Sequence, residues 1–168
     1  MSDTPYPQSK SERLRFEGRD DAKALVLKMA QQAKRQICIF GRDIDPILFD
    51  NPEFIDCVQN LALKSSRTEI KILVHDTLVN VQRDHRLIPL AQHLTSSIHI
   101  HTTAKQHRNS QQTLLLVDDF AYLKCPRATI YDGFACLYDR LEVRQLQKTF
   151  DDMWGQSSPD IGIRRLSL

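Results

Sequence analysis

Apolar and polar residues along this chain form a regular series of short and long blocks. Short runs rich in β-branched residues predict buried strands, and longer stretches with apolar residues at helical spacing predict helices between them. The expected strands are 14–16, 36–40, 68–74, 97–101, 114–117, 120–123 and part of 129–138, and the expected helices are 19–35, one opened by Asn51 and Pro52, 78–94 and 139–154. This alternation, closed by a group of strands and a last helix, predicts an α/β domain with a mixed sheet flanked by helices.

Two positions are expected to interrupt this pattern. Pro89 lies inside the helix expected at 78–94 and must kink it or split it in two. Asp132 and Gly133 predict a turn within 129–138. The expected domain covers 13–155, preceded by a polar segment at 1–12 that we expect to be disordered and followed by a tail at 156–168.

Composition narrows the class of protein. The chain has 168 residues, enough for one domain, and its net charge of +2 is too small for a histone-like partner. The four cysteines form no C-x-x-C pair, so a zinc knuckle or a thioredoxin motif is not expected. The polar N-terminus lacks the apolar region of a signal peptide, and no apolar run reaches membrane-spanning length. We therefore expect a cytoplasmic protein without a membrane partner.

The glycines exclude several enzyme classes. Only five occur, scattered along the chain, and none builds a phosphate-binding loop. The motifs G-x-x-x-x-G-K-[ST], G-x-G-x-x-G and G-x-S-x-G are all absent. A P-loop NTPase, a typical Rossmann dehydrogenase, an α/β-hydrolase and an acyl-CoA-dependent acetyltransferase are disfavoured, and no cofactor is expected.

Residues 113–123 (TLLLVDDFAYL) resemble the strand pair that carries the H-x-K-x4-D motif of the phospholipase D superfamily. In active members, the His attacks phosphorus and the Lys neutralises the phosphate oxygens. Asp118 matches the Asp of the motif, whereas Gln111 stands at the His position and Thr113 at the Lys position. The Gly-Ser stretch that completes the site falls on Lys124 and Cys125.

These replacements indicate a pseudoenzyme. Gln111 cannot act as a nucleophile, and Thr113 cannot neutralise a phosphate. The resemblance implies that activity needs two copies of the motif, and this chain has room for one. A homodimer would supply a second copy with the same replacements. The resemblance thus implies a single phospholipase D-like half without catalysis.

Much of the remaining chain resembles an uncharacterised phospholipase D-like domain family of proteobacteria. The matching segments are 45–50, 70–76, 85–94 and 163–166. In some relatives, such a domain is attached to an acetyltransferase domain, and the annotation of one can pass to the other. This resemblance implies a bacterial α/β domain and carries no established activity.

Polar residues follow several of the expected strands, where ligands bind in open α/β sheets. The functional interpretation is a cleft for a phosphate or other anion, and the alternative is a set of solvated charges and internal salt bridges. The candidate binding residues are Arg42, His75, His85, Arg86, His101, Lys105 and Arg108. His99, His101 and His107 also form a cluster, but nearby carboxylates or thiols at useful spacing are missing, so no metal is expected.

Three functions stay open at this point. The first is a non-catalytic phospholipase D-like module that binds an anionic ligand, nucleic acid or a protein partner. The second is a purely protein-interacting domain, for example a homodimer. The third is a phosphodiesterase with a rearranged site that uses His75, His85 or His101. A contiguous positive cleft favours the first, an exposed apolar patch the second, and converging histidines the third.

Overall fold

The computed structural model describes residues 11–160 and 163, and its strands form one mixed sheet. Most of the segment expected to be disordered, and most of the segment 163–166, lie outside these residues. The sheet order is β1-β7-β6-β5-β2-β3-β4-β8, in which β2, β3 and β4 are parallel and the other pairings are antiparallel. The strands are β1 (Leu14–Glu17), β2 (Gln36–Gly41), β3 (Glu69–Val74), β4 (Ile98–Thr102), β5 (Thr113–Val117), β6 (Ala121–Cys125), β7 (Asp132–Cys136) and β8 (Ser158–Pro159).

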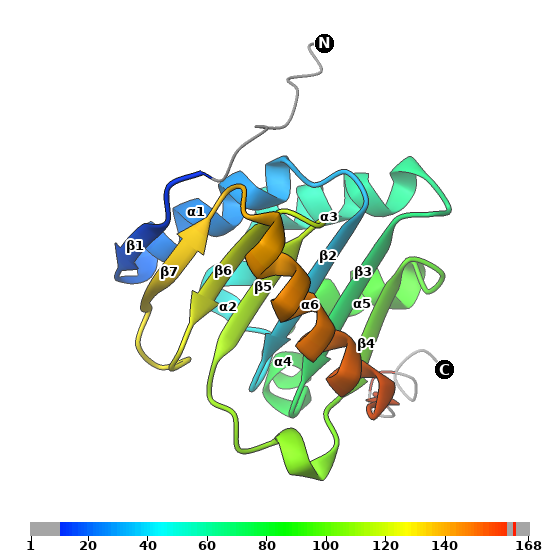
Figure 1. The fold of residues 1–168 in the computed structure, drawn as a ribbon. Helices are drawn as coiled ribbons and strands as arrows, with labels where there is room; N and C mark the ends of the chain where they lie inside the picture. Colours follow the sequence, from blue (N-terminus) through cyan, green and yellow to red (C-terminus); the bar gives the residue numbers. More distant parts are fainter. Residues whose placement is uncertain (1–10, 161–162, 164–168) are drawn as a thin grey trace.

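The helices lie on both faces of this sheet, as the alternating pattern predicts. The helical elements are α1 (Arg19–Gln31), α2 (Pro46–Phe49), α3 (Pro52–Lys64), α4 (Leu78–Gln82), α5 (Leu87–His93), the 3-10 turn η1 (Lys105–His107) and α6 (Arg140–Gly155). Helix α6 crosses one face of the sheet obliquely, and α1, α3 and α5 lie on the opposite face (Figure 1). The predicted α/β architecture with a flanked mixed sheet is confirmed.

Side-chain caps fix where two of these helices begin. The Asn51 side chain accepts a hydrogen bond from Phe54 N at 2.9 Å, and Pro52 occupies the first helical position, as expected for a helix start. Asp139 accepts from Glu142 N at 3.2 Å. The last helix therefore begins at Arg140, with Asp139 as its cap.

The expected helix at 78–94 is split, but Pro89 is not the cause. The break covers residues 83–86, where Asp84 adopts a positive φ of 55°. Pro89 lies in the first turn of α5, where a backbone N–H has no partner within the helix. The predicted split is confirmed, and the expected position of the break is wrong.

The turn expected at Asp132 and Gly133 is also wrong. Both residues open β7, and Gly133 lies opposite Phe16 of β1. A side chain at position 133 would collide with the Lys124 carbonyl and approach the Phe16 ring. Glycine is needed here because the neighbouring strands approach closely. A glycine inside a strand can mark such a close approach as well as a turn.

Two hydrophobic clusters hold the layers together. The larger one joins the sheet to α1, α3 and α5 through residues such as Val26, Phe54 and Ile72. The smaller one lies beneath α6 and includes Phe40 and Phe150. Because α6 is one oblique helix, β1, β7 and the adjoining part of β6 lie outside its path (Figure 1).

Candidate functional site

The C-terminal ends of β2, β3 and β4 lie at one edge of the sheet. The N-terminal end of β5 lies beside them, because β5 runs antiparallel to β2. Backbone hydrogen bonds tie the first two loops together. His75 N donates to the carbonyls of Gly41, at 3.2 Å, and Arg42, at 3.0 Å. Asp76 N donates to the Arg42 carbonyl at 3.1 Å. The loops after β2 and β3 are therefore held side by side.

The His75 ring links this pair of loops to the segment between β4 and β5. Its Nε2 lies 2.8 Å from the Ser110 carbonyl oxygen, and its Nδ1 lies 2.7 Å from Thr103 Oγ1. A carbonyl only accepts, so Nε2 carries a proton, and in the neutral ring Nδ1 accepts from the Thr103 hydroxyl. The ring also packs edge-on against Phe40, with centroids 5.6 Å apart. Both nitrogens of His75 are thus engaged within the fold.

Two arginines border His75 at this edge. Arg108 donates through Nε to the Thr103 carbonyl at 3.3 Å, so its remaining guanidinium donors stay available. Arg42 is exposed and follows directly after β2. We call Arg42, His75, Thr103, Arg108 and Ser110 the edge cluster. The exposed Lys105 of η1 is a third cation near this cluster, and it lies with Arg108 in the segment between β4 and β5.

The positions of the degenerate motif lie beside the edge cluster and offer no exposed nucleophile. Gln111 is exposed, and its carbonyl accepts from Ala128 N at 2.7 Å. Thr113 is buried in β5, opposite Cys125 of β6. The Cys125 thiol donates to the Ile130 carbonyl at 2.9 Å, and burial raises its pKa. The thiol is therefore kept in its neutral form.

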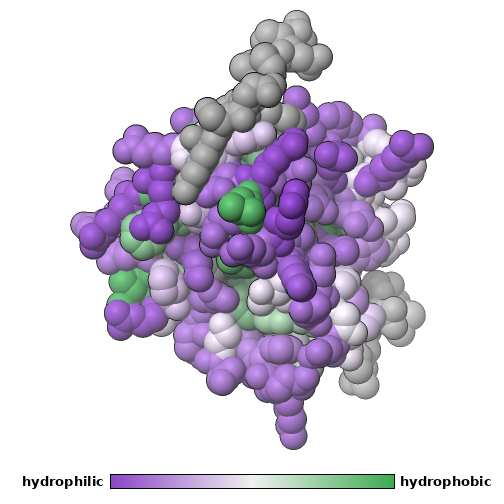
Figure 2. All heavy atoms as spheres, viewed as in Figure 1, coloured by the Kyte–Doolittle hydropathy of each residue, from purple (hydrophilic) through white to green (hydrophobic). Residues whose placement is uncertain are grey.

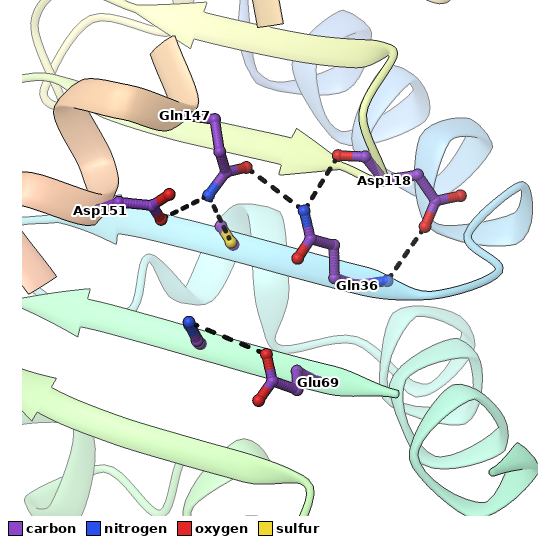
Figure 3. Close-up of polar contacts among 7 residues, drawn as sticks. Gln36, Glu69, Asp118, Gln147 and Asp151 are labelled. Carbon is purple, nitrogen blue, oxygen red and sulfur yellow. Dashed lines mark hydrogen bonds and ion pairs between the residues drawn. The ribbon is translucent and has the colours of Figure 1, made fainter. Parts of the chain in front are cut away.

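Asp118, the retained motif residue, lies at the other end of β5 and has a structural role. Its carboxylate accepts hydrogen bonds from the backbone N–H groups of Lys34 (3.0 Å), Arg35 (2.7 Å) and Gln36 (3.0 Å). Gln36 donates back to the Asp118 carbonyl and also contacts Gln147 of α6 (Figure 3). Asp118 thus fixes the entry into β2, far along the strand from the edge cluster.

His85 and Arg86 occupy the corner between α4 and α5, within the helical layer. Arg86 lies against Asp50 at the end of α2, with a backbone hydrogen bond of 3.3 Å and an ion pair of 3.9 Å. His85 is only 1 % exposed, and its Nδ1 accepts from Leu87 N at 3.2 Å. Its Nε2 has no hydrogen-bond partner among the described residues. Burial lowers the His85 pKa, against the opposing effect of the nearby Asp50 carboxylate.

The histidine cluster is separated by the end of α6. His101 stacks on Trp154 with ring centroids 3.9 Å apart, and its Nδ1 lies 2.8 Å from Ser157 Oγ. His107 lies 2.8 Å from the side-chain oxygen of Gln156. His99 lines a surface hollow beside α5, to which His101 also contributes. His101 and His107 therefore anchor the segment that follows α6, and the His101 ring is covered by Trp154.

Asp45 and Tyr131 form a hydrogen-bonded pair that sequence reasoning missed. Asp45 caps α2 through one oxygen, and its other oxygen accepts from the Tyr131 hydroxyl at 2.8 Å. Burial, and then this hydrogen bond, raise the pKa of Tyr131. Burial raises the Asp43 pKa too, helped by the Asp45 charge. No sequence spacing signals this pair, because its members are far apart in the chain.

The described residues contain no group of three or more His, Cys, Asp or Glu side chains placed to hold a metal ion. None of the helices within 11–160 is both long and apolar enough to cross a bilayer.

Comparison with known proteins places this fold. The sequence profile of a family described as Domain of unknown function (DUF7931) matches residues 18–166. Among curated proteins, no sequence matches the chain.

Solved structures give fold-level matches. Nuc from Salmonella typhimurium, a phospholipase D family member, has a TM-score of 0.56 at 18 % identity, covering 89 % of this chain and 99 % of that one. NucT from Helicobacter pylori has a TM-score of 0.59 at 9 % identity, with the same coverage. The archaeal chromatin protein TrmBL2 has a TM-score of 0.62 at 16 % identity, covering 94 % of this chain. Here the chain spans only 56 % of its neighbour. The fold is therefore phospholipase D-like.

Proposed function

Because the chain belongs to the DUF7931 family and has a phospholipase D-like fold, we propose that it is a non-catalytic module that binds phosphate-containing ligands at the edge cluster. The observation that carries this proposal is the contrast between the site's cations and its nucleophiles. Arg42 and Arg108 are exposed, whereas both ring nitrogens of His75 are engaged.

The lack of an available nucleophile supports the non-catalytic part. Attack on phosphorus needs a nucleophilic atom that can reach the substrate. His75 would have to break its hydrogen bonds to Thr103 and Ser110, and His101 would have to leave its stack with Trp154. His85 lies buried in the helical layer. The rearranged phosphodiesterase is therefore the weaker candidate.

The geometry of the edge favours anion binding. Arginine suits phosphate because its planar fork can hold two oxygens at once. Arg108 is positioned by its Nε bond to the Thr103 carbonyl, which leaves its terminal nitrogens free for a ligand. Arg86 is held by Asp50, so we place it outside the binding set. The chromatin protein with this fold shows a mode of DNA binding, which makes nucleic acid a reasonable ligand class here.

A purely protein-interacting domain, including a homodimer, is the second candidate. Its expected signature is a large exposed apolar patch. The face that carries α6 is mostly hydrophilic, with small separate hydrophobic areas (Figure 2). This distribution favours the anion-binding module. A bacterial and cytoplasmic setting, and an acetyltransferase domain attached in some relatives, stay predictions from the sequence resemblance.

The test is binding of pyrophosphate and of a short abasic DNA strand, which presents phosphates without bases. Wild type should bind both at about 50 mM salt and lose affinity as salt rises, because bound phosphates release counterions. One charge reversal should weaken binding less than about tenfold, since a single exposed ion pair contributes little. The double variant Arg42→Glu/Arg108→Glu should nearly abolish it.

The matched control is Arg35→Glu/Arg67→Glu, which makes the same charge change at the opposite edge of the sheet. This control should bind like wild type. Equal binding by both double variants, or no binding by wild type, would refute the edge site. Turnover of bis-p-nitrophenyl phosphate that survives repurification and disappears in His75→Ala would refute the non-catalytic proposal.

A further inference from the structure

A second surface with its own chemistry lies on the part of the sheet that α6 leaves uncovered. Arg15 of β1, Phe134 of β7 and Lys124 of β6 are direct cross-strand neighbours, so they form one row on the same face. Phe134 is 36 % exposed, although an aromatic ring in a sheet is usually covered. The row is therefore an aromatic side chain between two cations.

A third cation stacks on the exposed ring. The Arg13 guanidinium carbon lies 4.1 Å from the centre of the Phe134 ring, within cation–π distance. Arg13 is itself exposed to solvent. Nucleobases stack on aromatic rings and on arginine planes alike. Arg13 and Phe134 together thus form a stacking platform.

Four cations, Arg13, Arg15, Lys124 and Arg127, lie on or beside this platform. A surface hollow of about 310 Å³ adjoins Phe134 and is also lined by Arg15 and Arg127. Of the nearby acids, Glu17 is paired with Arg15 at 3.2 Å, and Asp132 accepts from Gly18 N at 3.1 Å. Within the described chain, no carboxylate lies within ion-pair distance of Lys124. Neighbouring acids therefore leave part of the positive charge uncompensated.

We propose that this basic aromatic face, made of Arg13, Arg15, Lys124, Arg127 and Phe134, binds single-stranded nucleic acid. Cations beside a stacking plane match a chain in which phosphates alternate with bases. A duplex hides its base faces within its own stack, so it cannot use the platform. The surface is distinct from the edge cluster, and this proposal does not depend on the proposed function.

The experiment compares three labelled probes of about twelve nucleotides at low salt: oligothymidylate, the matching oligouridylate and an abasic DNA strand. Fluorescence anisotropy with the full chain gives each affinity. Wild type should bind the two strands that carry bases more tightly than the abasic strand. Phe134→Ala should weaken binding of the base-carrying strands about tenfold or more and leave abasic binding unchanged. A preference between the two base-carrying probes would identify RNA or DNA as the source.

Further variants separate stacking from charge and from the edge cluster. Phe134→Leu keeps an apolar side chain and should behave like Phe134→Ala, whereas Leu141→Ala, at an exposed position on α6, should have no effect. Arg127→Glu should lower the salt dependence of binding, and Arg67→Glu should not. Arg42→Glu/Arg108→Glu should retain the preference for bases. Thermal melting checks that every variant is folded.

Equal affinity of wild type for oligothymidylate and the abasic strand would overturn the proposal, as would a Phe134→Ala variant with unchanged affinity. Binding to an acidic peptide with an affinity that exceeds the oligonucleotide affinity would overturn it in favour of a protein partner. If Arg42→Glu/Arg108→Glu lost the preference for base-carrying strands, the bases would bind at the edge cluster and not at Phe134, which would overturn the proposal. If the edge cluster binds no phosphate, the comparison of wild type with Phe134→Ala still tests this proposal, because it depends on Phe134 and not on the edge cluster.

Discussion

The two ends of β5 differ in what they keep of the phospholipase D-type motif. At one end, Asp118 holds the backbone N–H groups of three consecutive residues that lead into β2. At the other end, Gln111 is exposed to solvent, and Thr113 fills a small space beside Cys125. The retained residue is the one that the fold uses, and the replaced residues are those that phosphoryl chemistry would use.

If the module is non-catalytic, as proposed above, this difference explains how its fold can persist without phosphoryl chemistry. Asp118 cannot change without leaving part-buried backbone donors without their carboxylate partner. Gln111 is exposed and carries no comparable network, so the structure tolerates many side chains there, whereas buried Thr113 is restricted to small side chains. Stability therefore constrains Asp118 through its hydrogen bonds and Thr113 only through its size, and it constrains Gln111 little.

The largest effect that tests this contrast is expected from Asp118→Ala. Loss of charge-assisted hydrogen bonds to three backbone donors should lower the free energy of unfolding by about 3 kcal/mol or more. Urea denaturation monitored by Trp154 fluorescence measures this change. Asp118→Asn keeps one acceptor oxygen and should lose less.

The control is the neighbouring Asp119, which is exposed and contacts Arg140 at 3.9 Å. Asp119→Ala should change stability by less than about 1 kcal/mol, because exposed ion pairs contribute little. If Asp118→Ala were no more destabilising than Asp119→Ala, the retained aspartate would need a functional explanation.

The pH dependence of stability is a second test, at buried His85 in the corner between α4 and α5. Burial lowers its pKa in the folded chain, so the unfolded chain takes up the proton at a higher pH. The contribution of neutral His85 to the free energy of unfolding is full above the ordinary histidine pKa and is lost as the pH falls below that value. The loss is at most about 1.4 kcal/mol per pH unit for one proton. Wild type should thus lose more stability than His85→Gln between about pH 7 and pH 5.

Unfolding free energies of both proteins at each pH provide the measurement, and the other histidines cancel because both chains contain them. Parallel curves, or a wild-type gain on acidification, would contradict a neutral buried His85.

The smallest effects are expected at the replaced motif positions. Gln111→Ala should change the unfolding free energy by less than about 0.5 kcal/mol, as is usual for an exposed side chain. Thr113→Val removes a hydroxyl from a buried position of similar shape and should change it by less than about 1 kcal/mol. Chemical denaturation against wild type measures both. A loss comparable to that of Asp118→Ala would remove the contrast between the ends of β5.

Local sequence signals predicted the order of strands and helices well, because each depends on nearby residues. The Asn51 cap and Pro52 are a self-contained signal for a helix start. The break before α5 depends instead on a positive φ at Asp84, which no apolar period reveals. Gly133 looked like a turn because its requirement comes from Lys124 and Phe16, on strands distant in sequence.

The candidate site was predictable only in its location. Hydrogen bonds link the loops of Arg42, His75 and Arg108 at the edge of the sheet where the strand ends indicated candidate binding residues. Whether the histidine was available could not be read from the sequence, since its partners Thr103 and Ser110 come from another connection. His101 was likewise a candidate binding residue, and only the path of α6 brings Trp154 over its ring.

The strand order also constrains how this chain folds as it is synthesised. The first strand, β1, pairs with β7, and β4 gains its partner β8 only after α6 has been made. At ordinary translation rates, β1 leaves the ribosome of the order of ten seconds before β7. During that interval, β2, β3 and their helices can assemble through local crossovers, while β1 has no sheet edge to join. Nascent chains halted before β7 should therefore leave their N-terminal strand open to proteases or to a chaperone.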